Sequence, residues 1–352
     1  MNKSIRIKDI ALKAQVSVGT VDRVLHNRGR VSEDALKRVL AVLEEIDYKP
    51  NLIARTLGSN KAYKIALVVP DPSQDPYWEA PIEGILQAET EWARYGFRTD
   101  RFLFNQHDSR SFEYAAEQAL QSSPDGILIA PLFYRESLPF FKQFENKQIP
   151  FALFNTNIHE AKPLSFIGQD LNQSGRMAAE LICLGQPDSG TFAIVHIYED
   201  IQNSVHILEK EKGFTNFLKE RNKDYKTITI SLSNPDEQSF NNQISSLCNM
   251  PDLKGIFVST SKAYAIAAHL KQTKQKNIRL IGYDLIPENL VYLKSGEITF
   301  LINQNPKRQA FLGIRSLANY LLFKKEIQSI DLLPLEIITA ENLQSYLDSE
   351  IH

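Results

Sequence analysis

Residues 7–26 read IKDIALKAQVSVGTVDRVLH, and this stretch decides how the beginning of the chain folds. Small and apolar residues recur there at helical spacing and predict two short helices, with inward faces formed by Ile10, Ala11 and Ala14 and by Val21, Val24 and Leu25. Between them, Ser17 can begin the second helix by accepting a hydrogen bond from the backbone N–H near Thr20. Two short helices joined by a three- or four-residue turn make a helix-turn-helix. The periodicity alone is equally compatible with an ordinary pair of antiparallel helices.

The composition of the whole chain is that of a globular protein. It has 352 residues, of which 43% are hydrophobic and 23% charged, and this length predicts two or three folding units. The N-terminus lacks the apolar segment of a secretory signal, and no apolar run approaches the ~20 residues that span a bilayer. We therefore expect a cytoplasmic protein without a membrane partner. Cys183 and Cys248 have neither metal-type spacing nor a CxxC partner, which indicates core thiols and no metal site.

Charge is unevenly distributed along the chain. Residues 1–60 hold eleven Lys and Arg against seven Asp and Glu, whereas the whole chain has a net charge of −2. The first 60 residues therefore carry +4 and the remainder about −6. A basic head on an acidic body predicts that only the head meets nucleic acid.

From Lys64 onward, short apolar strands alternate with amphipathic helices. We expect strands near 64–69, 98–104, 125–130, 150–154, 165–168, 191–196, 226–231, 254–259, 278–282 and 298–302. Helical patterns fall near 78–95, 109–122, 136–145, 170–184, 203–220, 236–249, 261–271, 287–294 and 306–322. This order predicts parallel sheets with helices on both faces. Ten strands are too many for one small doubly wound sheet, so we expect two α/β lobes.

The identities of the residues in the head add to the helical pattern. The informative ones are Asp9-Ile10-Ala11, Val16-Ser17, Thr20-Val21, Arg23-Val24-Leu25, Val31-Ser32, Tyr48, Pro50-Asn51, Ala54 and Leu57. With these features the first part of the chain resembles the headpiece of the LacI/GalR family of transcription regulators along its whole length. The resemblance implies a helix-turn-helix whose second helix enters the major groove of operator DNA.

The same resemblance implies which side chains meet DNA. Those expected to face the groove are Val18, Gly19, Asp22, Arg23 and His26. Arg23 is the best candidate for a bidentate contact to guanine, with a phosphate contact as the alternative. Ser17 and Thr20 are expected to touch phosphates or to cap the helix.

Four residues depart from the family pattern and bear on DNA recognition. Gln15 stands where the family usually has a Gly with positive φ, at a cost of ~1 kcal/mol. Asp22 replaces the usual Ser, and could accept from cytosine N4, pair with Arg23 or repel phosphate. His26 replaces the usual Asn, and Gly19 offers no side chain. We therefore expect an operator sequence that differs from the familiar family consensus.

Residues 50–57, PNLIARTL, resemble the hinge helix of the family. That resemblance implies that Asn51, Ala54 and Leu57 contact DNA, with Leu57 wedged into the minor groove and Ala54 small enough for close approach of the twin helix. Apolar wedges of this kind unstack bases and bend the duplex. A disordered linker is the alternative, and an order–disorder change of this segment is compatible with both.

From residue 62 the chain resembles a type I periplasmic binding protein, with two α/β lobes joined by three crossovers and ligand in the cleft. Open α/β sheets bind ligands beyond the carboxyl ends of their strands. The candidates at these positions are Gln74, Asp75, Tyr77, Trp78, Asn155, Asp170, Thr260, Asp284 and Gln304. An aromatic face suits the C–H face of a sugar, whereas carboxylates and amides suit its hydroxyls. Trp78 could instead be a core residue, and Lys262 could overturn the expectation of a neutral ligand that follows from the absence of Arg.

Three parts are expected along the chain. They are a helix-turn-helix DNA-binding domain at 1–49, a hinge helix or linker at 50–61 and an effector-binding domain at 62–352. Within the last, we expect an N-lobe at about 62–160 and 288–320 and a C-lobe at about 161–287 and 321–352.

The sequence thus predicts a homodimeric, sequence-specific DNA-binding transcription regulator, a repressor, controlled by a small molecule that we expect to be a sugar. A protein partner or a non-sugar effector is one alternative, and a solute-binding protein is another. No Walker, GxSxG, HExxH or strand-linked GxGxxG motif occurs, so we expect no enzyme, no catalytic residue and no cofactor.

Overall fold

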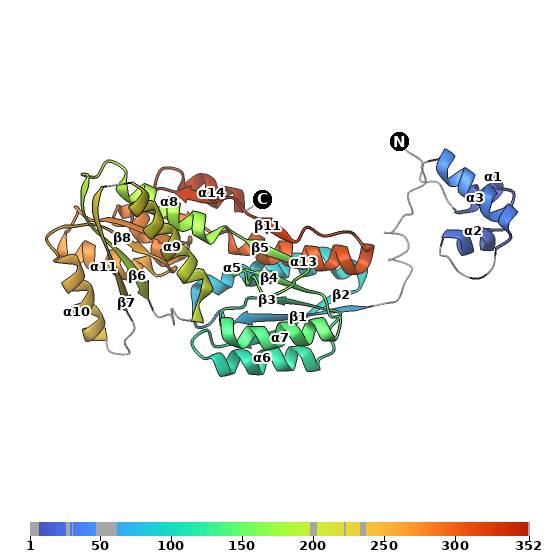
Figure 1. Ribbon diagram of the computed structural model, residues 1–352, viewed down its shortest axis with the longest axis horizontal. Coiled ribbons are helices and arrows are strands. Elements are labelled where there is room, and N and C mark those ends of the chain that lie inside the picture. The colour runs from blue at the N-terminus through green and yellow to red at the C-terminus, as the bar shows by residue number, and fades with distance from the viewer. Residues whose placement is uncertain are drawn as a thin grey trace. The chain divides into compact units, whose positions relative to one another are not determined.

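The computed structural model describes residues 7–25, 29, 31–46, 62–197, 203–221, 223–232 and 237–350. The chain divides into two compact units, Met1–Ser59 and Asn60–His352, which we call the headpiece and the body (Figure 1). None of the described helices is long and apolar enough to cross a membrane.

The headpiece contains the predicted helix-turn-helix, formed by α1 (Ile7–Lys13) and α2 (Val18–Leu25), followed by α3 (Glu33–Glu45). Its core consists mainly of the predicted apolar positions, with Ile10, Ala11, Ala14, Val21, Val39 and Val42 buried. Thr20 N donates to Ser17 Oγ at 3.1 Å, which confirms the predicted cap of α2. Gln15 has a φ of 51°, so the turn requires the left-handed conformation expected from the family pattern.

The first lobe of the body, the N-lobe, is built on a six-stranded sheet in the order β11-β5-β4-β3-β1-β2. All neighbouring strands in it are parallel. The strands are β1 (Tyr63–Pro70), β2 (Phe97–Phe104), β3 (Gly126–Ile129), β4 (Phe151–Phe154), β5 (Ser165–Gly168) and β11 (Ile330–Leu332). The helices that cover the two faces are α5 (Glu79–Trp92) and α13 (Pro306–Phe323) on one, and α6 (Ser109–Gln121) and α7 (Tyr134–Asn146) on the other (Figure 1).

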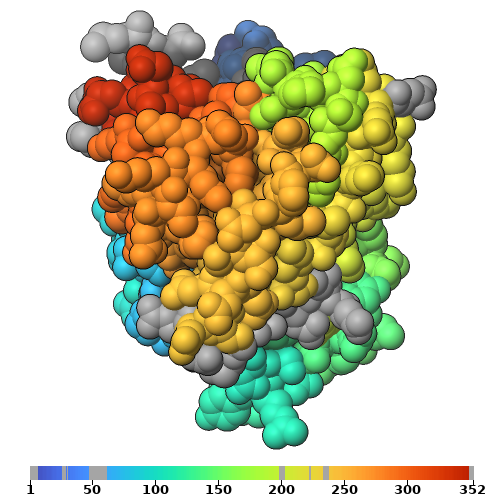
Figure 2. Space-filling view, turned by 90° about the vertical axis from the view of Figure 1, so that its left-hand side faces the viewer, coloured from blue at the N-terminus to red at the C-terminus, as the bar shows by residue number. Residues whose placement is uncertain are grey.

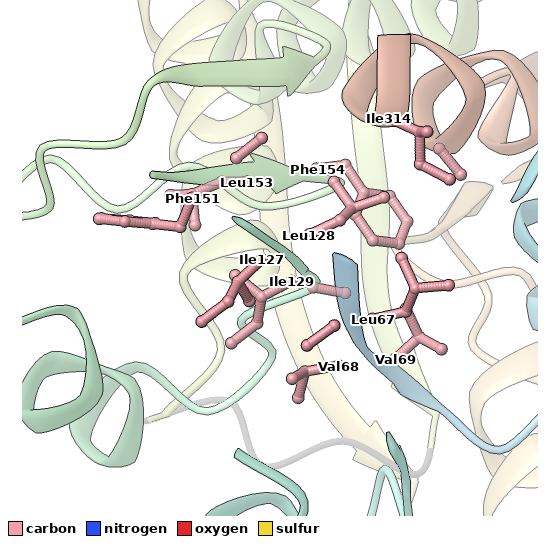
Figure 3. Close-up of a cluster of buried hydrophobic side chains, with 14 of the residues drawn as sticks. Leu67, Val68, Val69, Ile127, Leu128, Ile129, Phe151, Leu153, Phe154 and Ile314 are labelled. Carbon is pink, nitrogen blue, oxygen red and sulfur yellow. The ribbon is translucent and has the colours of Figure 1, made fainter. Parts of the chain in front are cut away.

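The core of the N-lobe lies on both faces of this sheet because side chains alternate along each strand. Leu67, Leu128 and Phe154 point to the face covered by α13, where Ile314 packs against them (Figure 3). The central strands β3 and β4 are apolar and buried along their whole length, as expected for a parallel sheet buried on both faces.

The second lobe, the C-lobe, has a sheet of the same size in the order β12-β10-β9-β8-β6-β7, in which β12 is antiparallel to β10. Its strands are β6 (Ser189–Ile197), β7 (Asp224–Leu232), β8 (Leu253–Val258), β9 (Arg279–Tyr283), β10 (Phe300–Asn303) and β12 (Glu336–Ile338). Its helices are α8 (Leu171–Cys183), α9 (Val205–Glu220), α10 (Glu237–Cys248), α11 (Ala263–Thr273), α12 (Pro287–Ser295) and α14 (Leu343–Glu350). Figure 2 shows the molecule from the side of this lobe, with colours that run from yellow-green near α8 to orange near α12.

All ten expected strands occur in the body, together with β11, β12 and α14, which the sequence pattern did not predict. The lobe boundaries need correction at three places. Strand β5 and strand β11 belong to the N-lobe sheet, although residues 161–287 and 321–352 were expected in the C-lobe. Helix α12 and strand β10 belong with the C-lobe, although 288–320 was expected in the N-lobe. The periodicity of a strand identifies it as buried but does not say which sheet it joins.

Candidate functional site

The surface of α2 carries the side chains expected to meet DNA. Val18 is 45% exposed, Gly19 and Arg23 are exposed, and Thr20 and Asp22 are half-buried, while Val21 points into the headpiece core. A Cβ at Gly19 would meet only Ser17 Oγ, at 3.7 Å, so packing within the headpiece does not require glycine there. His26, Asn51, Ala54 and Leu57 lie outside the described residues. Their proposed DNA contacts stay predictions.

A second candidate site is a cavity between the two lobes of the body. Seven of the nine expected ligand-binding residues line it, namely Asp75, Tyr77, Trp78, Asn155, Thr260, Asp284 and Gln304. They follow the carboxyl ends of strands β1, β4, β8, β9 and β10. This is the end of a parallel sheet at which α/β folds bind ligands.

Two of the expected ligand-binding residues do not line this cavity. Gln74 is exposed in the turn that follows β1. Asp170 is exposed and caps α8, because its Oδ1 accepts a hydrogen bond from Gln173 N at 2.9 Å. A carboxylate just before a helix is as well suited to capping as to ligand binding, and here its oxygen is turned to the helix.

Asn155 and Asp284 occupy equivalent places in the two lobes, each directly after a central strand and each with a φ of 68°. Asn and Asp adopt this left-handed conformation more readily than most residues. Asn155 Nδ2 donates to the Tyr77 hydroxyl at 2.6 Å, and Asp284 Oδ2 accepts from Gln304 Nε2 at 2.8 Å. The buried Gln309 links the two sets, since it accepts from Asn155 N at 2.9 Å and donates to Gln304 O at 2.8 Å.

Trp78 both packs in the core of the N-lobe, which confirms the core alternative, and lines the cavity, so that its contact with a sugar stays a prediction. It is 3% exposed, and its ring meets the Tyr77 ring edge-on with centroids 4.9 Å apart. Its indole Nε1 donates to Gln106 Oε1 at 2.9 Å. The ring is therefore held rigidly at the cavity wall.

Comparison with known proteins identifies both parts of the chain. Residues 6–51 match the model of bacterial regulatory proteins of the lacI family, and residues 65–325 match that of the periplasmic binding protein domain. The chain belongs to the LacI family. Its body is a periplasmic binding protein domain.

Relatives of this LacI-family regulator include the ribose operon repressor of Halalkalibacterium halodurans, 27% identical over 286 residues that make up 80% of each chain. The HTH-type transcriptional repressor PurR of Actinobacillus pleuropneumoniae is 26% identical over 341 residues, or 94% of each chain. Among solved structures, a LacI transcriptional regulator from Bacteroides fragilis has a TM-score of 0.74 at 27% identity, and the match covers 81% of this chain and 100% of that one.

The cavity of this LacI-family regulator has further lining residues that sequence reasoning did not assign to it. They are Gln106, Leu132, His206, Lys210, Ser259, Ser261 and Lys262. Of these, the sequence drew attention to Lys262 and to Ser261, which adjoins the predicted Thr260 after β8. His206 and Lys210 lie one turn apart on α9. The one sequence signal for them is that Lys210 falls on the apolar, buried face of an amphipathic helix.

Close packing of α8 against α9 brings Lys210 to the cavity. A Cβ at Gly175 of α8 would lie 1.9 Å from Lys210 O, and a Cβ at Gly213 of α9 would lie 1.9 Å from Asn172 O. The two glycines thus let the helix backbones touch. Lys210 is 2% exposed, donates from Nζ to Ser259 O at 3.1 Å and lies 3.7 Å from the centroid of the Tyr283 ring.

The two carboxylates of the cavity differ in their electrostatics. Burial raises the pKa of Asp284 to about 7, against the lowering influence of the Lys210 ammonium and of hydrogen bonds from Gln304. Asp284 Oδ1 is buried without a hydrogen-bond partner among the described residues. Burial also raises the pKa of Asp75, but Lys262, Gln106 and the Tyr77 backbone lower it more, so that this pKa lies below its ordinary value.

The histidine of the cavity wall is held neutral. Burial, reinforced by repulsion from Lys210 and His196, lowers the pKa of His206 to about 3. Its Nδ1 is enclosed and has no hydrogen-bond partner in the part of the chain that the structure describes. Together with Asp284 Oδ1, it gives the C-lobe wall two polar atoms that a ligand could satisfy.

Proposed function

We propose that this LacI-family regulator is a homodimeric repressor that reads a near-palindromic operator through α2 and the hinge at 50–61, and that a neutral sugar bound between the lobes controls its affinity for DNA. The observation that carries the proposal is the ring of hydrogen-bonding side chains around Tyr77 and Trp78, at the strand ends of a body joined to a LacI headpiece. Two half-sites suit a two-fold symmetric protein.

The balance of charge in the cavity supports a neutral ligand. Among the described lining residues, Lys262 forms an ion pair with Asp75. The positive charge of Lys210 favours the ionised form of Asp284. The negative charge of an anionic sugar would be repelled by a cavity carboxylate. The hydroxyl groups of a neutral sugar can donate to Asp284 Oδ1 and accept from a lysine. Among the relatives, the ribose operon repressors are named for a sugar operon, which favours the same class of effector.

Control of DNA binding requires that the sugar bind two conformations of the body unequally. The cavity measures about 40 Å³, whereas sites for small organic ligands enclose about 300–1,000 Å³. A sugar therefore needs a rearrangement of the lobes or of the lining side chains. Such a rearrangement supplies the two states that regulation requires.

Thermal unfolding of the full chain tests the proposal against neutral mono- and disaccharides, sugar acids and sugar phosphates. A ligand at about 100 times its dissociation constant adds ~2.7 kcal/mol of stability. We expect a shift with a neutral sugar, its loss in Trp78→Ala and Asp284→Ala, and its retention in the control Asp170→Asn, which lies outside the cavity. Shifts with anionic sugars alone would refute a neutral effector, and no shift at all would favour a protein partner or a non-sugar effector.

A further inference from the structure

An ion pair joins the two lobes across the cavity. The Lys262 ammonium, at the start of α11 in the C-lobe, donates to Asp75 Oδ2, at the start of the short helix η1 (Pro76–Trp78) in the N-lobe. The side chains are only 12% and 6% exposed. Both residues line the cavity that we assign to the effector.

The two ends of the pair differ in how firmly they are held. Asp75 is fixed by two further hydrogen bonds, since Oδ1 accepts from Tyr77 N at 3.0 Å and Oδ2 accepts from Gln106 Nε2 at 3.0 Å. Lys262 reaches Asp75 with an ammonium on a flexible four-carbon stem. When the pair separates, Lys262 is therefore the side chain that moves and Asp75 stays in place.

A second contact between the lobes does not involve the pair. Asn203 of the C-lobe accepts from Arg135 N at 3.0 Å and donates to Glu136 Oε2 at 2.7 Å, at the start of α7 in the N-lobe. This contact lies outside the cavity, so the lobes stay linked at the start of α7 while the cavity side, where Lys262 leaves Asp75, can open.

We propose that Lys262 is an internal competitor of the effector. In the ligand-free protein its ammonium satisfies Asp75 and draws the lobes together over a cavity too small for a sugar. The effector replaces it with a hydroxyl donor to Asp75, and the freed ammonium moves toward solvent. Lys262 thereby determines specificity, because only a ligand that donates a hydrogen bond to Asp75 can exchange with it. The identity of the ligand in this inference rests on the proposed neutral-sugar function. The role of the ion pair in the ligand-free protein does not depend on that function.

The first test measures the affinity of the best sugar from the thermal panel for Lys262→Met, which keeps the length of the side chain and removes its charge. We expect the sugar to bind about tenfold more tightly than to the wild-type chain, because it no longer has to break the ion pair. A pair this buried is stronger than an exposed one. The matched control is Lys271→Met on the same helix, exposed and outside the cavity, which should leave the affinity unchanged. In an Asp75→Asn background, Lys262→Met should change the affinity by less than about twofold, because the competitor has lost its charged anchor. Unchanged or weaker binding in Lys262→Met would overturn the proposal.

The second test needs no ligand and separates a failure of this inference from a failure of the sugar assignment. Trp92→Phe leaves Trp78 as the single tryptophan of the chain, and the indole Nε1 that it removes has no hydrogen-bond partner among the described residues. In this background, acrylamide should quench Trp78 fluorescence more strongly after Lys262→Met than after Lys271→Met. Equal quenching would mean that the pair does not hold the lobes together, whatever the effector is.

Discussion

Replacing Asp284 by Asn should change the way in which the stability of the body depends on pH. Asp284 is 2% exposed, and burial raises the pKa of its carboxyl to about 7 from an ordinary value of 3.8. Between about pH 4 and pH 7, Asp284 therefore keeps a proton in the folded protein that it releases in the unfolded chain. Asn has the same shape, tolerates the φ of 68°, and can still accept from Gln304 Nε2.

The sign and size of the effect follow from proton linkage. An acid whose pKa is raised on folding contributes stability at low pH, and this contribution is lost as the pH rises through about 7. Between about pH 5 and pH 8, this carboxyl should lower the free energy of unfolding by roughly 3 kcal/mol. Asp284→Asn does not titrate, so its stability relative to the wild type should rise by that amount over the same range.

The assay is thermal unfolding of the ligand-free wild type and of Asp284→Asn at a series of pH values. For a domain of this size the expected change corresponds to about 5–10 °C in the difference between the two Tm values. Asp170→Asn serves as the control, because its carboxylate is exposed and Asn caps a helix as well as Asp does. A Tm difference that stays constant from pH 5 to pH 8, or that moves the other way, would refute the reasoning.

Four further predictions concern the headpiece, the hinge and the C-lobe. Gln15→Gly should stabilise the headpiece by ~0.5–1 kcal/mol, because the φ of 51° favours glycine; slower hydrogen exchange of the α1 and α2 amides would support this, and faster exchange would contradict it. Arg23→Ala should cost ~1–3 kcal/mol of operator binding and relax base preference at one position of each half-site, whereas uniform weakening across sequences would indicate a phosphate contact. Leu57→Ala should weaken specific operator binding and leave sugar affinity nearly unchanged, and equal loss of both would argue against a minor-groove wedge. Gly175→Ala should destabilise the body by ~1–3 kcal/mol and weaken sugar binding, because a Cβ 1.9 Å from Lys210 O pushes α9 and its cavity side chains away; a stable variant with normal binding would be incompatible with that packing.

Local features of this protein could be predicted from its sequence because their physical causes are local. The period of apolar residues predicted the two short helices of the headpiece and ten of the twelve strands in the described residues, while the identities of the headpiece residues indicated the helix-turn-helix. The cap at Ser17 and the positive φ of Gln15 depend on a few neighbouring residues. Seven of the nine expected ligand-binding residues line one cavity because the carboxyl ends of parallel strands meet at one edge of each sheet.

Other features depend on contacts between residues far apart in the chain, and only the tertiary structure decided them. Strands β5 and β11 join the N-lobe because of the neighbours with which they pair, which no period reveals. Lys210 reaches the cavity because two glycines let α9 approach α8. Lys262 and Asp75 are 187 residues apart and meet only when both lobes have folded. Residue types and local spacing therefore predicted the parts of the site, whereas the packing of helices and lobes determined its charge balance and its size.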